Sequence, residues 1–101
     1  MIMQTFKHSR AILFCKEDCL PCTGAKDLLL KILSDHPDYA NNITTLRKET
    51  HPSLVGAYRV ELFPTLVIVD SLGEEQGKLV GGNAIRSQLE GILFALNAST
   101  K

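Results

Sequence analysis

The chain has 101 residues and the composition of an ordinary globular protein, with 45% hydrophobic and 22% charged residues. A chain of this length buries one usable core but is too short for two, so we expect a single domain over residues 1–101. Eleven Lys and Arg residues balance eleven Asp and Glu residues. This balance argues against a nucleic-acid partner, because binding to phosphates normally needs a basic excess.

The N-terminal segment, residues 1–8, lacks the long apolar stretch of a secretory signal, and no later segment approaches the ~18 apolar residues that span a bilayer. We therefore expect a cytoplasmic protein with no membrane partner. The three cysteines, Cys15, Cys19 and Cys22, are an odd number, which argues against a disulfide-stapled secreted framework. In a reducing compartment, closely spaced cysteines more often indicate redox chemistry or metal binding.

The first half of the chain predicts two strands and one long helix. Residues 11–15 form a short apolar run, which is typical of a strand buried on both faces. From Pro21 onward the apolar residues recur at three- and four-residue steps, which predicts an amphipathic helix that ends at Pro37. After a polar linker over residues 38–42, the β-branched segment 43–46 predicts a second strand.

The second half predicts a short helix, two strands and a final helix. Pro52 is typical of a first helical residue, and we expect this helix to run to about Tyr58. Residues 65–69 give the strongest strand signal, and a turn leads from them into an antiparallel strand over residues 77–80. Asn83 is a suitable N-cap for the final helix. The apolar face of that helix carries Ile85, Leu89, Ile92, Leu93 and Leu96.

The predicted order is strand, helix, strand, helix, strand, strand, helix. A crossover helix joins parallel strands, whereas a hairpin supplies antiparallel ones. We therefore expect an α/β fold with a mixed four-stranded sheet flanked by three helices. For the residues before Ala11, a loose extension and an extra edge strand both stay open.

The segment Cys19-Leu20-Pro21-Cys22 lies between the first strand and the first turn of the long helix. Free N–H groups and the positive end of the helix dipole favour a thiolate at Cys19, so we expect its pKa below the ~8.5 of a free thiol. This predicts Cys19 as the attacking sulfur. The spacing lets Cys22 bond to Cys19 and resolve a mixed disulfide. Pro21 is tolerated because a first-turn N–H needs no helical partner.

A CxxC pair also occurs in zinc sites, where further ligands complete a tetrahedral set. Cys15 could supply one of them, but the three histidines are scattered and none recurs at ligand spacing with the cysteines. Cys15 is more simply interpreted as a buried strand residue that acts as a small apolar side chain. A metal-binding module that uses Cys15, Cys19 and Cys22 stays open as an alternative.

Two further motifs, taken with the CxxC pair, resemble those of the thioredoxin superfamily. Phe63-Pro64, directly before the strongest strand, resembles the family's cis-proline motif. Gly81-Gly82, after the hairpin, resembles the glycine that lets a substrate backbone approach. Tyr58 lies about where the family has an aromatic residue at the end of the preceding helix, and we expect it to serve packing.

The resemblance, which covers roughly residues 11–96, implies a thioredoxin-like fold and a thiol–disulfide oxidoreductase that reduces protein disulfides. Cys19 would be the nucleophile and Cys22 the resolving cysteine, with no cofactor other than the redox-active Cys19–Cys22 disulfide. Expected partners are disulfide-containing target proteins and an electron donor similar to thioredoxin reductase, with the chain a monomer. A thioredoxin-fold binding subunit of a larger enzyme is a second interpretation. The resemblance implies substrate contacts at Leu20, Pro21, Phe63, Pro64, Gly81 and Gly82.

The chain departs from the family's pattern in three ways. Asp18 and Leu20 stand where typical thioredoxins carry tryptophan and glycine. The family's buried aspartate falls on Leu13; that acid helps to deprotonate the second cysteine, so Cys22 must be activated otherwise, for example through water. Only eighteen residues precede Cys19. The family's first strand and helix are therefore expected to be missing, as in minimal, glutaredoxin-sized versions of the fold.

Overall fold

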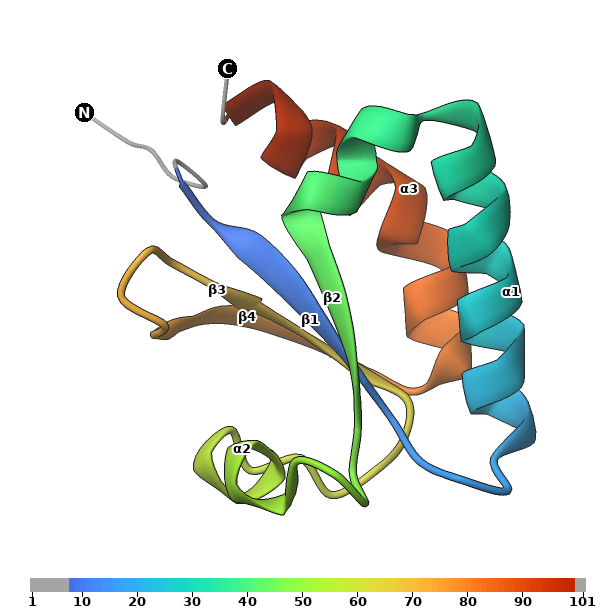
Figure 1. The fold of residues 1–101 in the computed structure, drawn as a ribbon, viewed down its shortest axis with the longest axis vertical. Helices are drawn as coiled ribbons and strands as arrows, with labels where there is room; N and C mark the ends of the chain where they lie inside the picture. Colours follow the sequence, from blue (N-terminus) through green and yellow to red (C-terminus); the bar gives the residue numbers. More distant parts are fainter. Residues whose placement is uncertain (1–7, 100–101) are drawn as a thin grey trace.

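The computed structural model describes residues 8–99, and its elements follow the predicted order (Figure 1). The expectation for the N-terminal segment falls largely on residues 1–7, which lie outside the described residues. The elements are β1 (Arg10–Cys15), α1 (Leu20–Asp35), the 3₁₀ helix η1 (Pro37–Asn42), β2 (Ile43–Arg47), α2 (Pro52–Ala57), β3 (Thr65–Val69), β4 (Glu75–Val80) and α3 (Gly82–Ser99).

The four strands form one mixed sheet in the order β2-β1-β3-β4. β1 and β2 are parallel, because α1 and η1 carry the chain back between them, whereas β3 is antiparallel to both β1 and β4. Helices α1 and α3 lie on one side of the sheet and α2 lies on the other (Figure 1). The α/β fold with a four-stranded mixed sheet is therefore confirmed.

Each side of the sheet has its own buried cluster. We call the side under α1 and α3 the α1/α3 face and the opposite side the α2 face. β3 is buried along its whole length because helices cover both sides of it. The α1/α3 face buries Ala11, Leu13, Cys15, Cys22, Ala25, Leu29, Ile32, Tyr39, Leu66, Ile68, Ile85, Leu89, Leu93 and Leu96. The α2 face buries Ile12, Phe14, Val60, Val67 and Val69.

The segment after α1 is not the polar linker that the sequence predicts. It forms η1, in which Tyr39 and Asn42 are buried. The Tyr39 ring stacks on His36 at 4.5 Å between ring centroids and joins the α1/α3 cluster. The Asn42 side-chain amide donates to Asn97 Oδ1 of α3 at 3.1 Å, so one aromatic and one amide fix a segment of polar composition.

Two element starts differ from the prediction. β4 begins at Glu75 rather than at residue 77, because Glu75 still pairs with Val69 beyond an irregularity in the ladder. The polar residues at this end of an edge strand did not indicate the earlier start. α3 begins at Gly82, so Asn83 is a helical residue and not the N-cap. Gly81 occupies the position before the helix with φ of 94°, a conformation that favours glycine.

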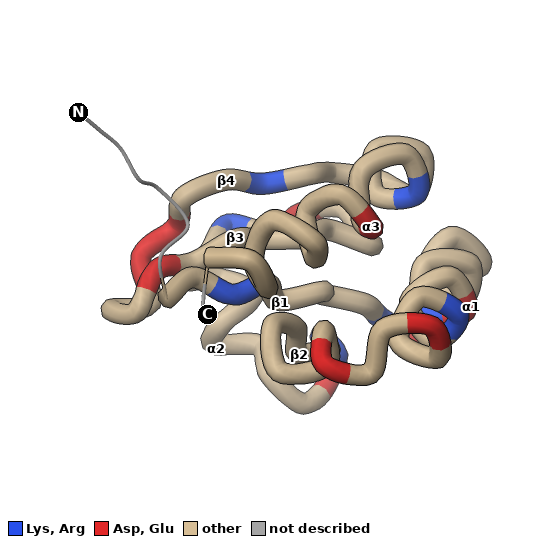
Figure 2. The backbone as a smooth tube through the Cα atoms, turned by 90° about the horizontal axis from the view of Figure 1, so that it is seen from above, with Lys and Arg blue, Asp and Glu red and all other residues tan. Residues whose placement is uncertain are grey.

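Charged residues of both signs are interspersed over the described part of the chain (Figure 2). No helix within residues 8–99 is long and apolar enough to cross a membrane.

Candidate active site around Cys19 and Cys22

The turn into α1 is made by residues that adopt non-helical backbone conformations. Asp18 has φ of 54°, in the left-handed region where Asp is tolerated better than bulky residues. Cys19 is extended, with φ of −131° and ψ of 103°, and is the N-cap of α1. Leu20 and Pro21 form the start of the helix, and the missing N–H of Pro21 costs nothing there. The expected strand-to-helix position of the CxxC segment is confirmed.

The two cysteines of this segment lie at disulfide distance, with 5.2 Å between their Cα atoms. The Cys22 backbone N–H donates to the Cys19 sulfur at 3.3 Å. Cys19 is half-buried, whereas Cys22 is only 1% exposed. Cys19 is thus the sulfur that a large molecule can reach, and it stands at the positive end of the α1 dipole, which favours a thiolate.

Phe63 lies opposite the cysteine pair. The Phe63–Pro64 peptide bond is cis, as expected, and Pro64 is fully buried behind it. The carbonyl oxygen of Phe63 lies 3.6 Å from the Cys19 sulfur. The Gly81 N–H donates to the Pro64 carbonyl oxygen at 2.8 Å, so the start of α3 is attached to the same loop.

Two lysines flank the ring of Phe63. The ammonium of Lys16 lies 6.0 Å from the ring centroid and that of Lys48 lies 5.7 Å from it. Both distances fall in the range of a weak cation–π attraction. The aromatic residue next to the Cys19 sulfur therefore has two ammonium groups close to its ring.

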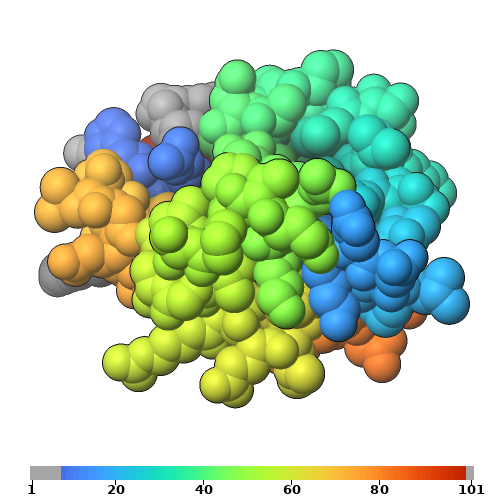
Figure 3. All heavy atoms as spheres, turned by 60° about the horizontal axis from the view of Figure 1, so that its bottom comes forward, coloured from blue at the N-terminus to red at the C-terminus, as the bar shows by residue number. Residues whose placement is uncertain are grey.

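The loop before Cys19 is tied to the end of β2. Arg47 forms a salt bridge with Glu17 at 3.0 Å, and the Glu17 backbone N–H donates to the Glu49 carboxylate at 3.1 Å. This backbone donor lowers the pKa of Glu49 from its usual value. In Figure 3 the loop after β1 (blue) lies against the green-to-yellow segments around α2, and the orange start of α3 emerges beside the first turn of α1.

A groove of about 380 Å³ runs between the first turns of α1 and α3. It brings together three predicted contact residues, Leu20, Pro21 and Gly82, with Asn83 and Arg86. Leu20 is 86% exposed. A Cβ added at Gly82 would lie 3.3 Å from the Pro21 Cβ, so this glycine allows α3 to approach the CxxC turn closely. The residue that approaches Gly82 most closely in this structure is thus Pro21 of the CxxC segment.

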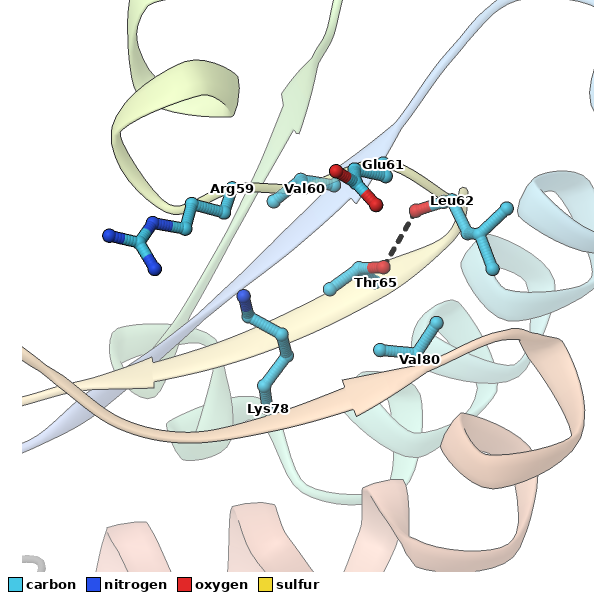
Figure 4. A pocket seen from close by; sticks show the side chains of 7 residues that line it. All are labelled: Arg59, Val60, Glu61, Leu62, Thr65, Lys78 and Val80. Atoms are coloured by element: carbon cyan, nitrogen blue, oxygen red, sulfur yellow. Dashed lines mark hydrogen bonds between the residues drawn. The ribbon is translucent and has the colours of Figure 1, made fainter.

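A second hollow of about 110 Å³ lies under the loop before Pro64 (Figure 4). Leu62 and Val80 line it and are 64% and 47% exposed, and the Thr65 hydroxyl donates to the Leu62 carbonyl oxygen at 2.6 Å. Figure 4 shows Arg59 directed away from the hollow. The sequence analysis did not name Leu62 and Val80 as candidate contact residues. Their positions, directly before Phe63-Pro64 and directly before Gly81, could have indicated them.

Cys15 is a free thiol in a fully buried position. Burial raises the pKa of the Cys15 thiol, and the positive charge of Lys26 opposes this effect. The prediction that Cys15 is a buried strand residue is confirmed. Within residues 8–99 no group of three or more His, Cys, Asp or Glu side chains is arranged to hold a metal ion.

Leu13 and Tyr58 both occupy positions that the resemblance singled out. Leu13 is fully buried in the same cluster as Cys22, so an apolar side chain occupies the position where the resemblance placed an acid. Tyr58 packs against Phe14 at 6.1 Å between ring centroids, and its hydroxyl donates to the Gly73 carbonyl oxygen. Tyr58 therefore ties the end of α2 to the β3–β4 hairpin, as expected of a packing residue.

Comparison with known proteins identifies the fold. No protein-family model matches the chain, and no curated protein matches it. Among solved structures, the thioredoxin of Malassezia sympodialis superposes with a TM-score of 0.72 at 19% identity, covering 90% of this chain and 76% of the other. Fasciola hepatica thioredoxin superposes with a TM-score of 0.71 at 18% identity, covering 89% of this chain and 83% of the other.

The mitochondrial thioredoxin 3 of Saccharomyces cerevisiae superposes with a TM-score of 0.66 at 23% identity, covering 89% of this chain and 80% of the other. The described part of this chain is shorter than these thioredoxins. The protein has the thioredoxin fold, and its Cys19-Leu20-Pro21-Cys22 segment holds two cysteines at disulfide distance.

Proposed function

We propose that the protein is a thiol–disulfide oxidoreductase that reduces disulfide bonds in target proteins. Cys19 is the nucleophile and Cys22 the resolving cysteine. The observation that carries the proposal is the asymmetry of the pair: Cys19 is half-buried at the helix N-terminus, whereas Cys22 is 1% exposed behind it. Two sulfurs at bonding distance with such different access suit two successive steps of one exchange reaction.

In the first step the Cys19 thiolate attacks one sulfur of the target disulfide. A bond forms between Cys19 and that sulfur, the target S–S bond breaks, and the second target sulfur leaves as a thiolate. The Cys22 N–H, 3.3 Å from the Cys19 sulfur, stabilises the attacking anion. In the second step the Cys22 thiolate attacks Cys19. The Cys19–Cys22 disulfide forms and the remaining target sulfur leaves.

The surface around Cys19 suits an extended target segment. The exposed side chain of Leu20, the groove beside Gly82, and Leu62 and Val80 next to the Phe63–Pro64 loop and Gly81 offer contacts for apolar side chains of such a segment. Phe63, Pro64 and Gly81 form the loop and strand end on the opposite side. We assign substrate contacts to these residues.

The catalytic cycle needs an external reductant, because each turnover leaves the Cys19–Cys22 disulfide oxidised. We propose a reductase similar to thioredoxin reductase as the electron donor, a monomeric chain, and a reducing compartment such as the cytoplasm. No further cofactor enters the exchange, since both electrons pass between sulfur atoms.

Reduction of insulin disulfides in the presence of dithiothreitol tests this function. The folded wild-type protein should accelerate the reaction well above the dithiothreitol background. Cys19→Ser and Cys22→Ser should each lower the rate to that background, while the matched control Cys15→Ser should keep a rate near that of the wild type. Circular dichroism confirms that each variant is folded. A folded wild-type protein that gives no acceleration would overturn the proposal in favour of a binding role.

A further inference from the structure

The proposed second step requires a thiolate at Cys22, and the surroundings of Cys22 oppose it. Cys22 is 1% exposed and belongs to the buried cluster of the α1/α3 face. Burial among apolar side chains disfavours the charged form of a thiol. Among the described residues no Asp or Glu is buried, and the fully buried Leu13 of the same cluster is apolar, so no buried carboxylate is available to take the proton.

Lys26 is the cationic side chain placed to offset this cost. It follows Cys22 by four residues on α1, and at 100° per residue the two side chains lie about 40° apart around the helix axis. Lys26 is half-buried, unlike the exposed Lys31 of the same helix. Within residues 8–99 the Lys26 ammonium takes part in no salt bridge.

The charge of Lys26 reaches Cys15, which is buried in the α1/α3 face. It acts on Cys15, at the end of β1, against the effect of burial. Cys15 and Cys22 belong to the same buried cluster, one on the strand and one on the helix that covers it. The four-residue spacing and the half-burial of Lys26 thus place it on the side of α1 that carries Cys22, and its charge acts on the neighbouring sulfur of Cys15.

The other charged groups around Cys15 and Cys22 are already paired or lie elsewhere. On β2, Arg47 faces Cys15 across the ladder but is bound to Glu17 of the preceding loop at 3.0 Å. Lys16 and Lys48 both lie over the Phe63 ring, although the Lys48 backbone N–H bonds to the Cys15 carbonyl oxygen. On α3, Arg86 lies against Gly24, on the opposite side of α1. Asp27 of α1 is exposed.

We infer that Lys26 is a positioning residue for the proposed reaction: its ammonium stabilises the Cys22 thiolate while that sulfur attacks the mixed disulfide at Cys19. This inference rests on the proposed function. The Cys22 proton goes to solvent, Lys26 keeps its own proton, and the pair of electrons on Cys22 forms the new bond to Cys19. The bond between Cys19 and the target sulfur breaks, and the departing thiolate takes its proton from solvent.

All proteins in this experiment carry Cys15→Ser, so that only Cys19 and Cys22 react. Stopped-flow mixing of the reduced protein with excess 5,5′-dithiobis(2-nitrobenzoic acid) separates the two steps. Attack by Cys19 releases the first chromophore, and attack by Cys22 on the resulting mixed disulfide releases the second. Lys26→Met should slow the second release about tenfold at pH 7, because one unit in the Cys22 pKa changes the thiolate fraction tenfold. The pH midpoint of that phase should rise by about one unit, and the first phase should be unchanged.

Lys31→Met is the matched control, because Lys31 is an exposed lysine about 180° around α1 from Cys22. It should leave both phases unchanged. Lys26→Arg, which keeps the charge, should restore most of the second-phase rate, whereas Lys26→Gln should behave as Lys26→Met and replaces it if the methionine variant does not fold.

The outcomes distinguish the two proposals. A wild-type protein with two phases, together with neutral Lys26 variants whose second phase and pH midpoint are unchanged, would overturn the role of Lys26 alone. Equal slowing by Lys26→Arg and Lys26→Gln would also overturn it, because charge would then be irrelevant. A wild-type protein that forms no Cys19–Cys22 disulfide would overturn the proposed function and, with it, this inference.

Discussion

The two faces of the sheet are covered unequally. Two long helices, α1 with 16 residues and α3 with 18, cover the α1/α3 face, whereas α2, with 6 residues, covers the other. Cys22 is part of the larger cluster, and α1 is held by the packing of that whole face. The cysteine side of the site therefore rests on the better-covered core.

The loop opposite the cysteines rests partly on the smaller cluster. Phe63 packs against both clusters, so it joins the two sides of the sheet next to the Cys19 sulfur. The segment between α2 and Phe63 is held by Val60 and by the Lys78 ammonium, which donates to the Tyr58 carbonyl oxygen at 2.7 Å. One half of the site is therefore fixed by extensive apolar burial, and the other half by a small apolar cluster and a few polar contacts.

Truncating one isoleucine on each face should reveal this difference in stability most strongly. Ile68 and Ile12 lie on neighbouring strands, are 6% and 7% exposed, and face opposite sides of the sheet. We expect Ile68→Ala to lower the free energy of unfolding by about 4 kcal/mol and Ile12→Ala by about 2.5 kcal/mol. The short α2 can settle into a cavity more easily than two long helices can.

Urea unfolding of both variants measures this difference, with unchanged slopes as the control for two-state behaviour. Equal losses, or a larger loss for Ile12→Ala, would show that the α2 face is as firmly packed as the other.

The pH dependence of the free energy of unfolding, a smaller effect, tests whether water is excluded from the α1/α3 face around Cys15. Because burial raises the folded-state pKa of Cys15 above that of a free thiol, the unfolded chain loses this proton at a lower pH than the folded protein. The stability that the neutral thiol contributes is thus fully present below about pH 9 and is lost as the pH rises through the raised folded-state pKa. The loss should reach at most about 1.4 kcal/mol per pH unit.

Cys15→Ala removes this titrating group. We expect the stability of the oxidised wild-type protein, measured by urea unfolding from pH 7 to pH 10.5, to fall more steeply above pH 9 than that of the variant. Parallel curves would mean that solvent reaches Cys15.

The sequence predicted most elements because their apolar patterns are clear. The buried run at residues 11–15, the helical period after Pro21 and the run at residues 65–69 each gave the element that the structure contains. The sequence did not predict η1, because its residues are mostly polar and its buried tyrosine is a weak signal by itself. The predicted β4 was too short, because an edge strand needs few apolar residues.

The candidate site could be predicted only where a motif marks it. The CxxC and Phe63-Pro64 motifs are each short and continuous in sequence, so each could be recognised, and the resemblance to the thioredoxin superfamily implied that they belong to one site. The structure adds the approach of the Phe63 carbonyl oxygen to the Cys19 sulfur. The contact of Gly82 with Pro21 and the exposure of Leu62 depend on how distant elements pack, which no local pattern reveals.

The most direct test of the central claim, that Cys19 attacks and Cys22 resolves, is to trap the intermediate. Cys22→Ser removes the resolving sulfur and leaves Cys15 and Cys19 free. When this variant is incubated with disulfide-bonded insulin, it should accumulate a covalent complex that dithiothreitol reduces. Peptide mapping by mass spectrometry should locate the mixed disulfide at Cys19. The wild-type protein should accumulate none, because Cys22 resolves it. A mixed disulfide at Cys15, or no complex with the folded variant, would contradict the account.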